Sequence, residues 1–398
     1  MRFCSKSLNN SVKKHIFFIF LSWRLLITIG MLSGLLLSWQ KRFFGAGEDH
    51  YKNIYLWSWA NFDGFHYLSI AYNGYHLFQQ AFFPLYPILI SISTFLSATE
   101  GIYSGLIISH LSFLLFLLLF VKLLKIDYKE NNIYWILLLF IFFPTSFYLG
   151  SVYTESLFLF LSVASFYFAR KGRWFLASLF AAFASGTRLI GIFLLPFLVV
   201  EYFWQKYETE VSVKKNKTTL FQCLKLTLWK VKKDVYWIVL SPLGLILYTI
   251  WLKFVYNDFL YFQHALPAFG SNKSGNSFIL LPQVFFRYLK IILFSNFNYQ
   301  YVIAVIELLV TMVFLILSII AFRKIRFSYA LFSLLSFVAP TLTGSLSSMP
   351  RYVLTIFPLF IVLNILLKFK WLKIIVLFFF VILLIIATGL FTRGYWIS

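Results

Sequence analysis

The sequence contains few acidic residues, and one of them stands in an unusual setting. Only 13 Asp and Glu occur among the 398 residues, and Asp63 lies between aromatic residues, namely Trp59, Phe62 and Phe65. A carboxylate that is partly shielded from water can act as a general base, so Asp63 is the candidate catalytic residue. The alternative is structural, because an Asp-Gly pair such as Asp63-Gly64 often forms a turn.

Two arginines stand where the charge pattern does not favour them. Arg188 and Arg351 each begin an apolar run at its predicted outer end, where the positive end of the helix dipole repels a cation. A nearby anion would account for both, and a phosphate fits because guanidinium groups bind its oxygens bidentately. The alternatives are pairing with Asp63, Glu155 or Asp258, or snorkelling to lipid headgroups.

Other polar side chains could support such a site. Glu155 stands at the predicted outer start of a span, where the helix dipole alone would also explain a carboxylate. Arg24, near the middle of the first span, must face protein or an aqueous cavity. A lone His66 predicts no zinc site, and no cofactor is predicted, although metal use stays open. The predicted substrate-binding or supporting residues are Arg24, His66, Tyr67, Glu155 and Tyr352.

Together these residues suggest one group transfer. Asp63 would take the proton from an acceptor hydroxyl, which attacks the anomeric carbon of a sugar. Arg188 and Arg351 would meanwhile hold the departing lipid phosphate. Such a single displacement inverts the anomeric centre and needs no covalent intermediate.

The composition places these residues in a membrane protein. The chain is 61% hydrophobic and 12% charged, with a mean hydropathy of +0.83, whereas soluble domains are about 45–50% apolar. The apolar residues form runs of about twenty, the length of a membrane-spanning helix, and do not alternate as barrel strands do. The net charge of +22 does not indicate nucleic-acid binding, because basic residues lie between the apolar runs.

The apolar runs predict an all-α integral membrane protein with about eleven transmembrane helices. A single polytopic domain would cover residues 1–398. With the N-terminus inside, most of the 35 Lys and Arg fall on cytoplasmic segments, and the C-terminus lies outside. Acidic residues on the inside loops are expected to be solvated. The predicted spans are residues 15–38, 102–121, 133–150, 154–169, 174–187, 189–204, 235–255, 300–322, 327–344, 352–367 and 372–391.

Three predicted loops are long. Residues 39–101 and 256–299 are extracytoplasmic, and long loops in compact proteins tend to be functional. The first is aromatic and is predicted to carry interfacial helices and the catalytic residue. Residues 205–234 form a Lys-rich cytoplasmic loop, which is more typical of a topology signal near anionic lipid than of a binding site. Residues 15–38 carry Arg24 and no small-residue cleavage site, so they are predicted to be a retained anchor.

Four sequence blocks, taken in order, resemble one known family. They are WANFDGFHYLSIAYNGY with AFFPLYPIL, then YTESLF, GTRLIGIFLLP and MPRYVLTIFPLF, and the similarity runs from about residue 20 to 370. This set is similar to the PIG-V family, which comprises the second mannosyltransferase of GPI-anchor assembly and its prokaryotic relatives. One block alone would be a weak signal, whereas four in order are specific.

The resemblance implies a GT-C glycosyltransferase with many membrane spans. Its active site would face the lumen or exterior, and it would use a polyprenyl-phosphate sugar, typically dolichyl-phosphate mannose. The catalytic acid of the first outside loop falls on Asp63, and the later blocks contain Glu155, Arg188 and Arg351.

The expected partners are the polyprenyl-phosphate donor, a glycolipid or glycan acceptor and membrane lipid, with no nucleic acid and a partner subunit left open. The short chain has no recognisable endoplasmic-reticulum retrieval signal, which favours a bacterial or archaeal plasma membrane. A transporter or a flippase of lipid-linked sugars is the alternative from another class. The acids gather at outer loops and no two halves match, which favours the enzyme.

Overall fold

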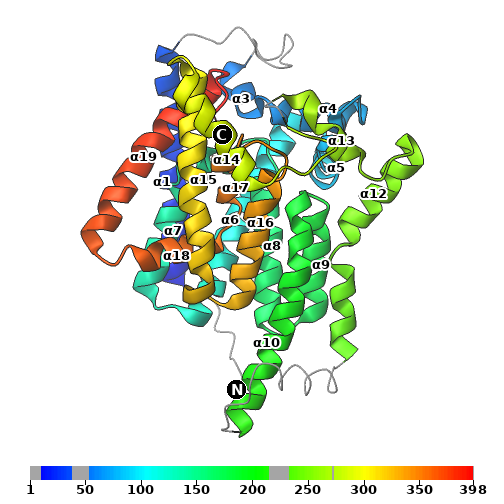
Figure 1. The fold of residues 1–398 in the computed structure, drawn as a ribbon, viewed down its shortest axis with the longest axis vertical. Helices are drawn as coiled ribbons and strands as arrows, with labels where there is room; N and C mark the ends of the chain where they lie inside the picture. The colour runs from blue at the N-terminus through cyan, green and yellow to red at the C-terminus, as the bar shows by residue number, and fades with distance from the viewer. Residues whose placement is uncertain (1–9, 38–52, 215–232, 271–272, 398) are drawn as a thin grey trace.

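The computed structural model describes residues 10–37, 53–214, 233–270 and 273–397, and these are built almost entirely from helices (Figure 1). Within these ranges one isolated β-bridge occurs, between Ile279 and Thr343. The helices are, in chain order, α1 (Asn10–Ser33), η1 (Gly34–Leu36), α3 (Ile54–Trp57), η2 (Ser58–Ala60), α4 (Asp63–Asn73), η3 (Gln79–Ala81), α5 (Leu85–Ser97), α6 (Gly101–Asp127), α7 (Glu130–Ile141), η4 (Ser146–Gly150), α8 (Glu155–Arg170), α9 (Trp174–Ser185), η5 (Leu189–Phe193), α10 (Leu194–Lys214), η6 (Lys233–Leu240), α12 (Leu243–Tyr256), α13 (Tyr261–His264), η7 (Leu266–Phe269), α14 (Leu281–Phe294), α15 (Tyr299–Lys324), α16 (Phe327–Thr341), α17 (Met349–Leu354), α18 (Pro358–Leu366) and α19 (Lys370–Thr392).

Several of these helices could cross a membrane. Five segments of the described chain are long and apolar enough, namely Val12–Leu36, Gly101–Asp127, Leu189–Glu208, Tyr299–Lys324 and Lys370–Thr392. A sixth crossing is formed if η6 and α12, bent by 41° at the break before Pro242, act as one span. Four further apolar helices, α5, α7, α9 and α16, are only 10–17 residues long. The predicted all-helical membrane fold is thus confirmed, whereas the number of eleven spans stays a prediction.

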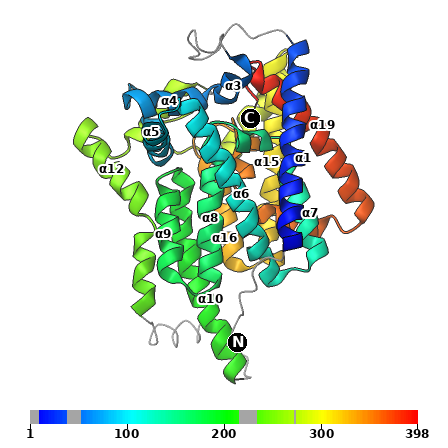
Figure 2. The ribbon, with the colours of Figure 1, turned by 180° about the vertical axis from the view of Figure 1, so that it is seen from behind.

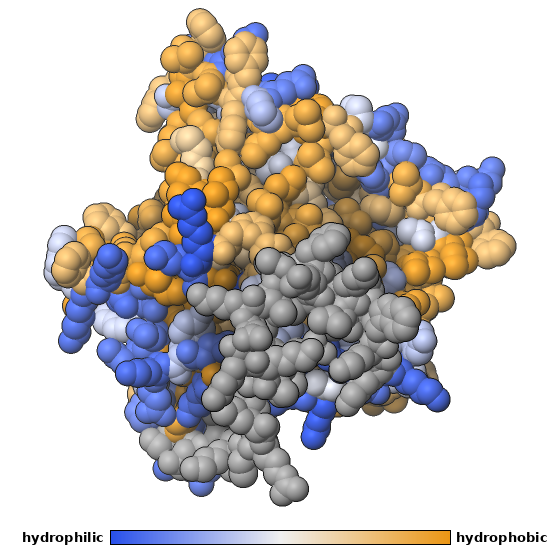
Figure 3. All heavy atoms as spheres, turned by 60° about the horizontal axis from the view of Figure 1, so that its bottom comes forward, coloured by the Kyte–Doolittle hydropathy of each residue, from blue (hydrophilic) through white to orange (hydrophobic). Residues whose placement is uncertain are grey.

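The two ends of the helix bundle differ in character. Figures 1 and 2 show that α1 begins and α10 ends at the bottom, whereas α4, α5 and the C-terminus lie at the top. The basic turns that join α6 to α7, α8 to α9 and α15 to α16 also lie at the bottom. Figure 3 shows hydrophilic side chains gathered at this end, with hydrophobic side chains on the flanks above it. Asp63, the first residue of α4, therefore lies at the end opposite the basic turns.

The Lys-rich loop predicted for residues 205–234 is only partly described. Helix α10 continues to Lys214, ten residues beyond the predicted end of its span, and residues 215–232 lie outside the described residues. Residues 39–52 of the predicted catalytic loop also lie outside them. The described remainder of that loop carries α3, η2, α4, η3 and α5, as the prediction of helices in this loop requires.

Prolines interrupt or begin several helices of the bundle. Pro144 follows α7, and the chain continues through the short helix η4 before α8 begins. Pro340 lies inside α16 one residue before its end, and Pro358 begins α18. Proline lacks the N–H donor and disrupts the preceding helical turn. Irregular backbone at membrane depth is tolerated where it lines a cavity, so these breaks indicate where a site can form.

The first and last helices cross at glycines. A Cβ atom added to Gly34 of η1, which directly follows α1, would lie 2.7 Å from the carbonyl oxygen of Gly389 in α19. One added to Gly389 would lie 2.9 Å from the carbonyl oxygen of Gly30. Small residues let two membrane helices approach this closely. The crossing fixes α19 against α1 and brings its end to the top of the bundle.

An ion-pair network joins helices at the opposite end. Glu201 of α10 is fully buried and accepts a hydrogen bond from Arg326 Nε at 2.9 Å. Arg326 also binds both carboxylate oxygens of Glu208, and Arg170 binds both oxygens of Asp127. Asp127 and Glu208 lie on predicted inside loops, where the sequence suggests only solvation. They instead help to hold α6, α8, α10 and α16 together.

Candidate active site

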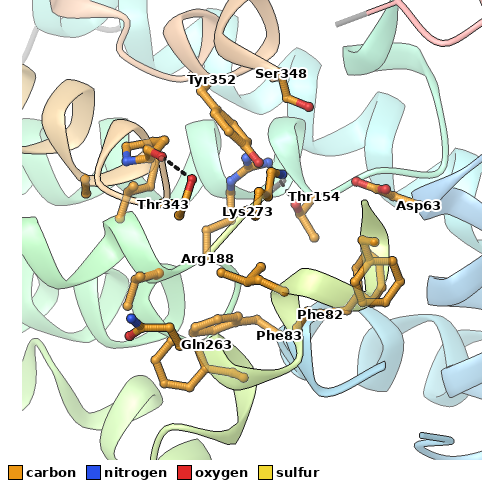
Figure 4. A pocket seen from close by; sticks show the side chains of 18 of the residues that line it. Asp63, Phe82, Phe83, Thr154, Arg188, Gln263, Lys273, Thr343, Ser348 and Tyr352 are labelled. Atoms are coloured by element: carbon orange, nitrogen blue, oxygen red, sulfur yellow. Dashed lines mark hydrogen bonds between the residues drawn. The ribbon is translucent and has the colours of Figure 1, made fainter. Parts of the chain in front are cut away.

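A cavity of about 240 Å³ lies at the upper end of the bundle, among the interrupted helices. Its lining includes five residues predicted from the sequence, which are Asp63, Tyr67, Arg188, Arg351 and Tyr352. Figure 4 shows Asp63, Arg188 and Tyr352 directed toward this space. Residues from both long predicted outside loops contribute to the wall, so the fold brings distant parts of the chain to one place.

Asp63 begins α4 directly after a strained turn. Phe62 has φ 57° and ψ −114°, a backbone conformation that residues with a Cβ atom rarely adopt. The Phe62 ring lies 5.0 Å from the ring of Trp396, edge to face. The Asn61 side-chain amide donates to the carbonyl oxygen of Phe391 at 2.9 Å. The end of α19 and the residues after it therefore hold the turn that positions Asp63.

Arg351 connects two carboxylates. Its Nη1 atom donates to Asp63 Oδ2 at 2.7 Å, and its Nε atom lies 3.3 Å from Glu155 Oε1 without hydrogen-bond geometry. Glu155 also accepts a hydrogen bond from Arg188 Nη1 at 2.6 Å. The structure thus shows the alternative explanation for the arginines, which is pairing with Asp63 and Glu155. Their contact with a phosphate stays a prediction.

Aromatic rings surround the Arg351 guanidinium. Its central carbon lies 5.3 Å from the ring of Tyr148, 5.5 Å from Tyr153 and 5.3 Å from Tyr352. Cations at this distance are attracted to the faces of aromatic rings. Arg351 lies on α17, which begins after Ser348, a residue with φ 70°. Both partners of the central ion pair therefore follow closely on a residue with positive φ.

Glu155 is the first residue of α8, where the helix dipole favours a carboxylate. Its side chain is 1% exposed, and its Oε2 atom has no hydrogen-bond partner in the described part of the chain. The Thr154 hydroxyl accepts from Arg188 at 3.1 Å and lies 3.4 Å from the Tyr67 hydroxyl. Burial, reinforced by the charges of Asp63 and Glu155, raises the pKa of Tyr67, so its hydroxyl stays protonated.

With this geometry in place, comparison with known proteins decides the family. The family described as Mannosyltransferase (PIG-V) matches residues 17–233, more than half of the chain. The chain belongs to the PIG-V mannosyltransferase family. The predicted family is thereby confirmed, and the matched region contains the first three of the four sequence blocks. The matched region of this PIG-V protein contains Asp63, Glu155 and Arg188, whereas Arg351 lies beyond it.

One curated relative is the human protein named GPI alpha-1,6-mannosyltransferase 2. It is 32% identical to this chain over 152 residues, which cover 35% of this chain and 31% of the human protein. The match therefore spans about a third of the human protein's length. No solved structure matches the chain.

Three predicted supporting residues, Arg24, His66 and Glu155, do not line the cavity, although Glu155 pairs with both lining arginines. The His66 ring stacks on Phe82 at 4.9 Å, and Phe82 lines the cavity. Burial lowers the pKa of His66 although the Asp63 charge opposes this, so the imidazole is neutral at neutral pH. The Arg24 guanidinium lies 4.7 Å from the Trp59 ring, and its Nη1 atom has no partner among the described residues. Supporting roles for His66 and Arg24 stay predictions.

Three other residues that line the cavity were not predicted from the sequence, namely Lys273, Ser348 and Trp396. One feature of the sequence could have pointed to Lys273, because a lysine in an outside loop departs from the positive-inside pattern. No feature of the sequence points to Trp396, because its contact with Phe62 depends on the packing of α19. Across the described residues, no group of three or more His, Cys, Asp or Glu is placed to hold a metal ion.

Behind the cavity wall, Glu307 of α15 holds the start of α17. This carboxyl group is 4% exposed, and its oxygens accept from the Ser348 N–H at 3.2 Å and the Tyr288 hydroxyl at 2.7 Å. The Tyr288 hydroxyl in turn accepts from the Leu346 N–H at 3.1 Å. Buried polar groups that are fully bonded rigidify their surroundings. Glu307 thus fixes the backbone that leads into Arg351.

Proposed function

We propose that this cavity transfers mannose from a polyprenyl-phosphate mannose to a hydroxyl group of a lipid-linked or surface glycan. The mannosyltransferase family and the name of the human relative support the sugar and the class of reaction. The observation that carries the proposal is the pair formed by Asp63 and Arg351 in the cavity wall. It joins a candidate base to a group that keeps this base ionised.

The proposed reaction is a single displacement at the anomeric carbon. The acceptor oxygen bonds to this carbon while its proton moves to Asp63, and the bond to the phosphate oxygen breaks. The bonding electron pair leaves with the phosphate, giving a polyprenyl phosphate and a glycoside of inverted configuration. Asp63 is the one carboxylate among the described residues that line the cavity. By analogy with glycoside hydrolases, a retaining route uses a second carboxylate as nucleophile, so a single acid supports inversion.

The apolar part of the lining supports a lipid-linked donor. Phe262, Leu266, Phe269 and Phe278, all from the second predicted outside loop, line the cavity together with the polar groups. Figure 4 shows Phe82 and Phe83 below Arg188 and Tyr352. A prenyl chain gains free energy from such contacts, and a phosphate gains it from the polar groups. We further propose that the cavity faces the extracytoplasmic side of a bacterial or archaeal plasma membrane.

The donor class can be tested with purified protein in liposomes. Supplied with a lipid extract as acceptor, the protein is expected to transfer radiolabelled mannose from polyprenyl-phosphate mannose and not from GDP-mannose. Polyprenyl-phosphate glucose serves as the control for the sugar. Label that reaches the lipid acceptor from GDP-mannose alone would contradict the proposed donor. Treating the product with α- and β-mannosidases reports its configuration.

The pH dependence of transfer should report the ion pair at Asp63. Burial raises the pKa of this carboxyl, but the charge and hydrogen bond of Arg351, with the charge of Lys273, bring it below its ordinary value of about 4. An ionised base is active above its pKa and is lost as the pH falls through it. We therefore expect kcat/KM to stay constant from neutral pH down to about pH 5. A decline centred near pH 6 would contradict Asp63 as the base.

A further inference from the structure

The charges of the cavity lining, together with Glu155 directly behind it, do not cancel. Asp63 and Glu155 pair with Arg188 and Arg351, and these four groups together are formally neutral. Lys273 also lines the cavity, and the ion pairs formed by the described residues do not include it. The cavity therefore carries one positive charge that no carboxylate of the described chain neutralises through an ion pair.

Lys273 is held at the cavity by the residues that follow it. The Ser274 N–H donates to the carbonyl oxygen of Thr343 at 2.8 Å, and Thr343 itself lines the cavity. Gly275 is packed so closely that a Cβ atom there would lie 3.1 Å from the carbonyl oxygen of Gln263. Figure 4 shows the Lys273 side chain within the space lined by the other polar groups. This lysine is thus anchored to the site by the backbone of the two residues that follow it.

Arg351 is poorly placed to bind a substrate anion. Its side chain is 7% exposed and already contacts Asp63 and Glu155. If the guanidinium turned toward a phosphate, it would leave these two carboxylates without their shared partner, which is costly in a buried site. Lys273 forms no ion pair with a carboxylate of the described residues, and its single charge matches the single negative charge of a phosphodiester.

We propose that Lys273, and not Arg351, binds the phosphate of the lipid donor. The inference rests on the proposed function and names the residue of the cavity that binds the donor phosphate. Arg188, whose side chain is 13% exposed and also lines the cavity, is placed to share this phosphate. Sequence reasoning assigned the phosphate to Arg188 and Arg351, so the inference keeps the first arginine and replaces the second.

The electrostatic match improves as the reaction proceeds. When the bond between the anomeric carbon and the phosphate oxygen breaks, the phosphate changes from a diester to a monoester and gains negative charge. An ammonium group fixed beside this oxygen then stabilises the transition state more than the ground state. Lys273 should consequently affect both donor binding and the rate of transfer.

Binding measured without turnover tests the inference separately from catalysis. Purified protein in detergent is titrated with farnesyl phosphate and with farnesol by microscale thermophoresis. Wild-type protein is expected to prefer the phosphate, and Lys273→Ala should weaken farnesyl phosphate binding about 10- to 100-fold while farnesol binding is unchanged. Lys273→Arg should retain most of the preference. Lys290→Ala is the matched control, because Lys290 is an exposed lysine of the same outside segment and does not line the cavity.

The outcomes separate the two proposals. A Lys273→Ala protein that keeps the wild-type preference overturns the inference and leaves the proposed function standing. A wild-type protein that binds the alcohol and the phosphate equally well contradicts the lipid-phosphate donor, and the inference falls with it. The thermal unfolding midpoint checks that each variant is folded. Lys273→Gln, which keeps a polar side chain, replaces the Ala variant if that variant does not fold.

Discussion

The Asp63→Asn variant is expected to fold and to lose sugar transfer, with a single-turnover rate about 10²- to 10⁴-fold below that of the wild type. Asn has nearly the shape of Asp, but its amide cannot take up the acceptor's proton. The Asp63 side chain is 18% exposed and lines the cavity, so a substrate can reach it. The measurement is mannose transfer in proteoliposomes supplied with polyprenyl-phosphate mannose.

Asp258→Asn is the matched control for this experiment. Asp258 pairs with His264 at 2.6 Å in the second predicted outside loop and does not line the cavity, so its loss should leave transfer unchanged. Normal turnover by a well-expressed Asp63→Asn protein would refute the proposal that Asp63 is the general base. It would favour the transporter or flippase alternative, which needs no base at this position.

The Arg351→Ala variant is expected to be both unstable and inactive. Removing this buried guanidinium leaves Asp63 and Glu155 without their shared cation, and a broken buried ion pair costs about 3–5 kcal/mol of unfolding free energy. Transfer should fall together with stability because Asp63 loses the contact that orients it. Denaturant unfolding in mixed micelles measures the first effect. Arg323→Ala, an exposed arginine at the opposite end, is the control and should unfold like the wild type.

A double-mutant cycle identifies the origin of that instability. If the cost comes from unpaired carboxylates, adding Asp63→Asn to Arg351→Ala should destabilise the protein less than the sum of the single changes. Strictly additive losses would show that the ion pair is not the cause. The contacts of Arg351 with the rings of Tyr148, Tyr153 and Tyr352 would then account for its stability.

The hydrophobic pattern could locate the long helices because crossing a bilayer demands a nearly fixed number of apolar residues. The predicted spans 102–121 and 300–322 fall within α6 and α15. The interrupted helices were harder to predict. Pro340 and Pro358 are visible in the sequence, but whether a proline bends a helix or ends it depends on the neighbours that satisfy the freed backbone groups.

The site was predicted in part, and for a physical reason. Asp63, Arg188 and Arg351 attract notice because charged groups in apolar surroundings are costly and need partners. The sequence could not say which partners they find, because the Asp63–Arg351 pair joins residues far apart in the chain. Lys273 is held at the site by the hydrogen bond of the next residue to Thr343 and by the packing of Gly275, and such contacts leave no local sequence pattern.

The contact of Asn61 and Phe62 with the end of α19 has a consequence for biogenesis. The turn before the candidate base is held by residues more than three hundred positions downstream, which are synthesised long after the turn itself. Insertion of the early helices therefore cannot by itself create a competent enzyme, and fragments restricted to residues 17–233 should be inert. We expect transfer activity to appear only after the end of α19 has packed against Asn61 and Phe62.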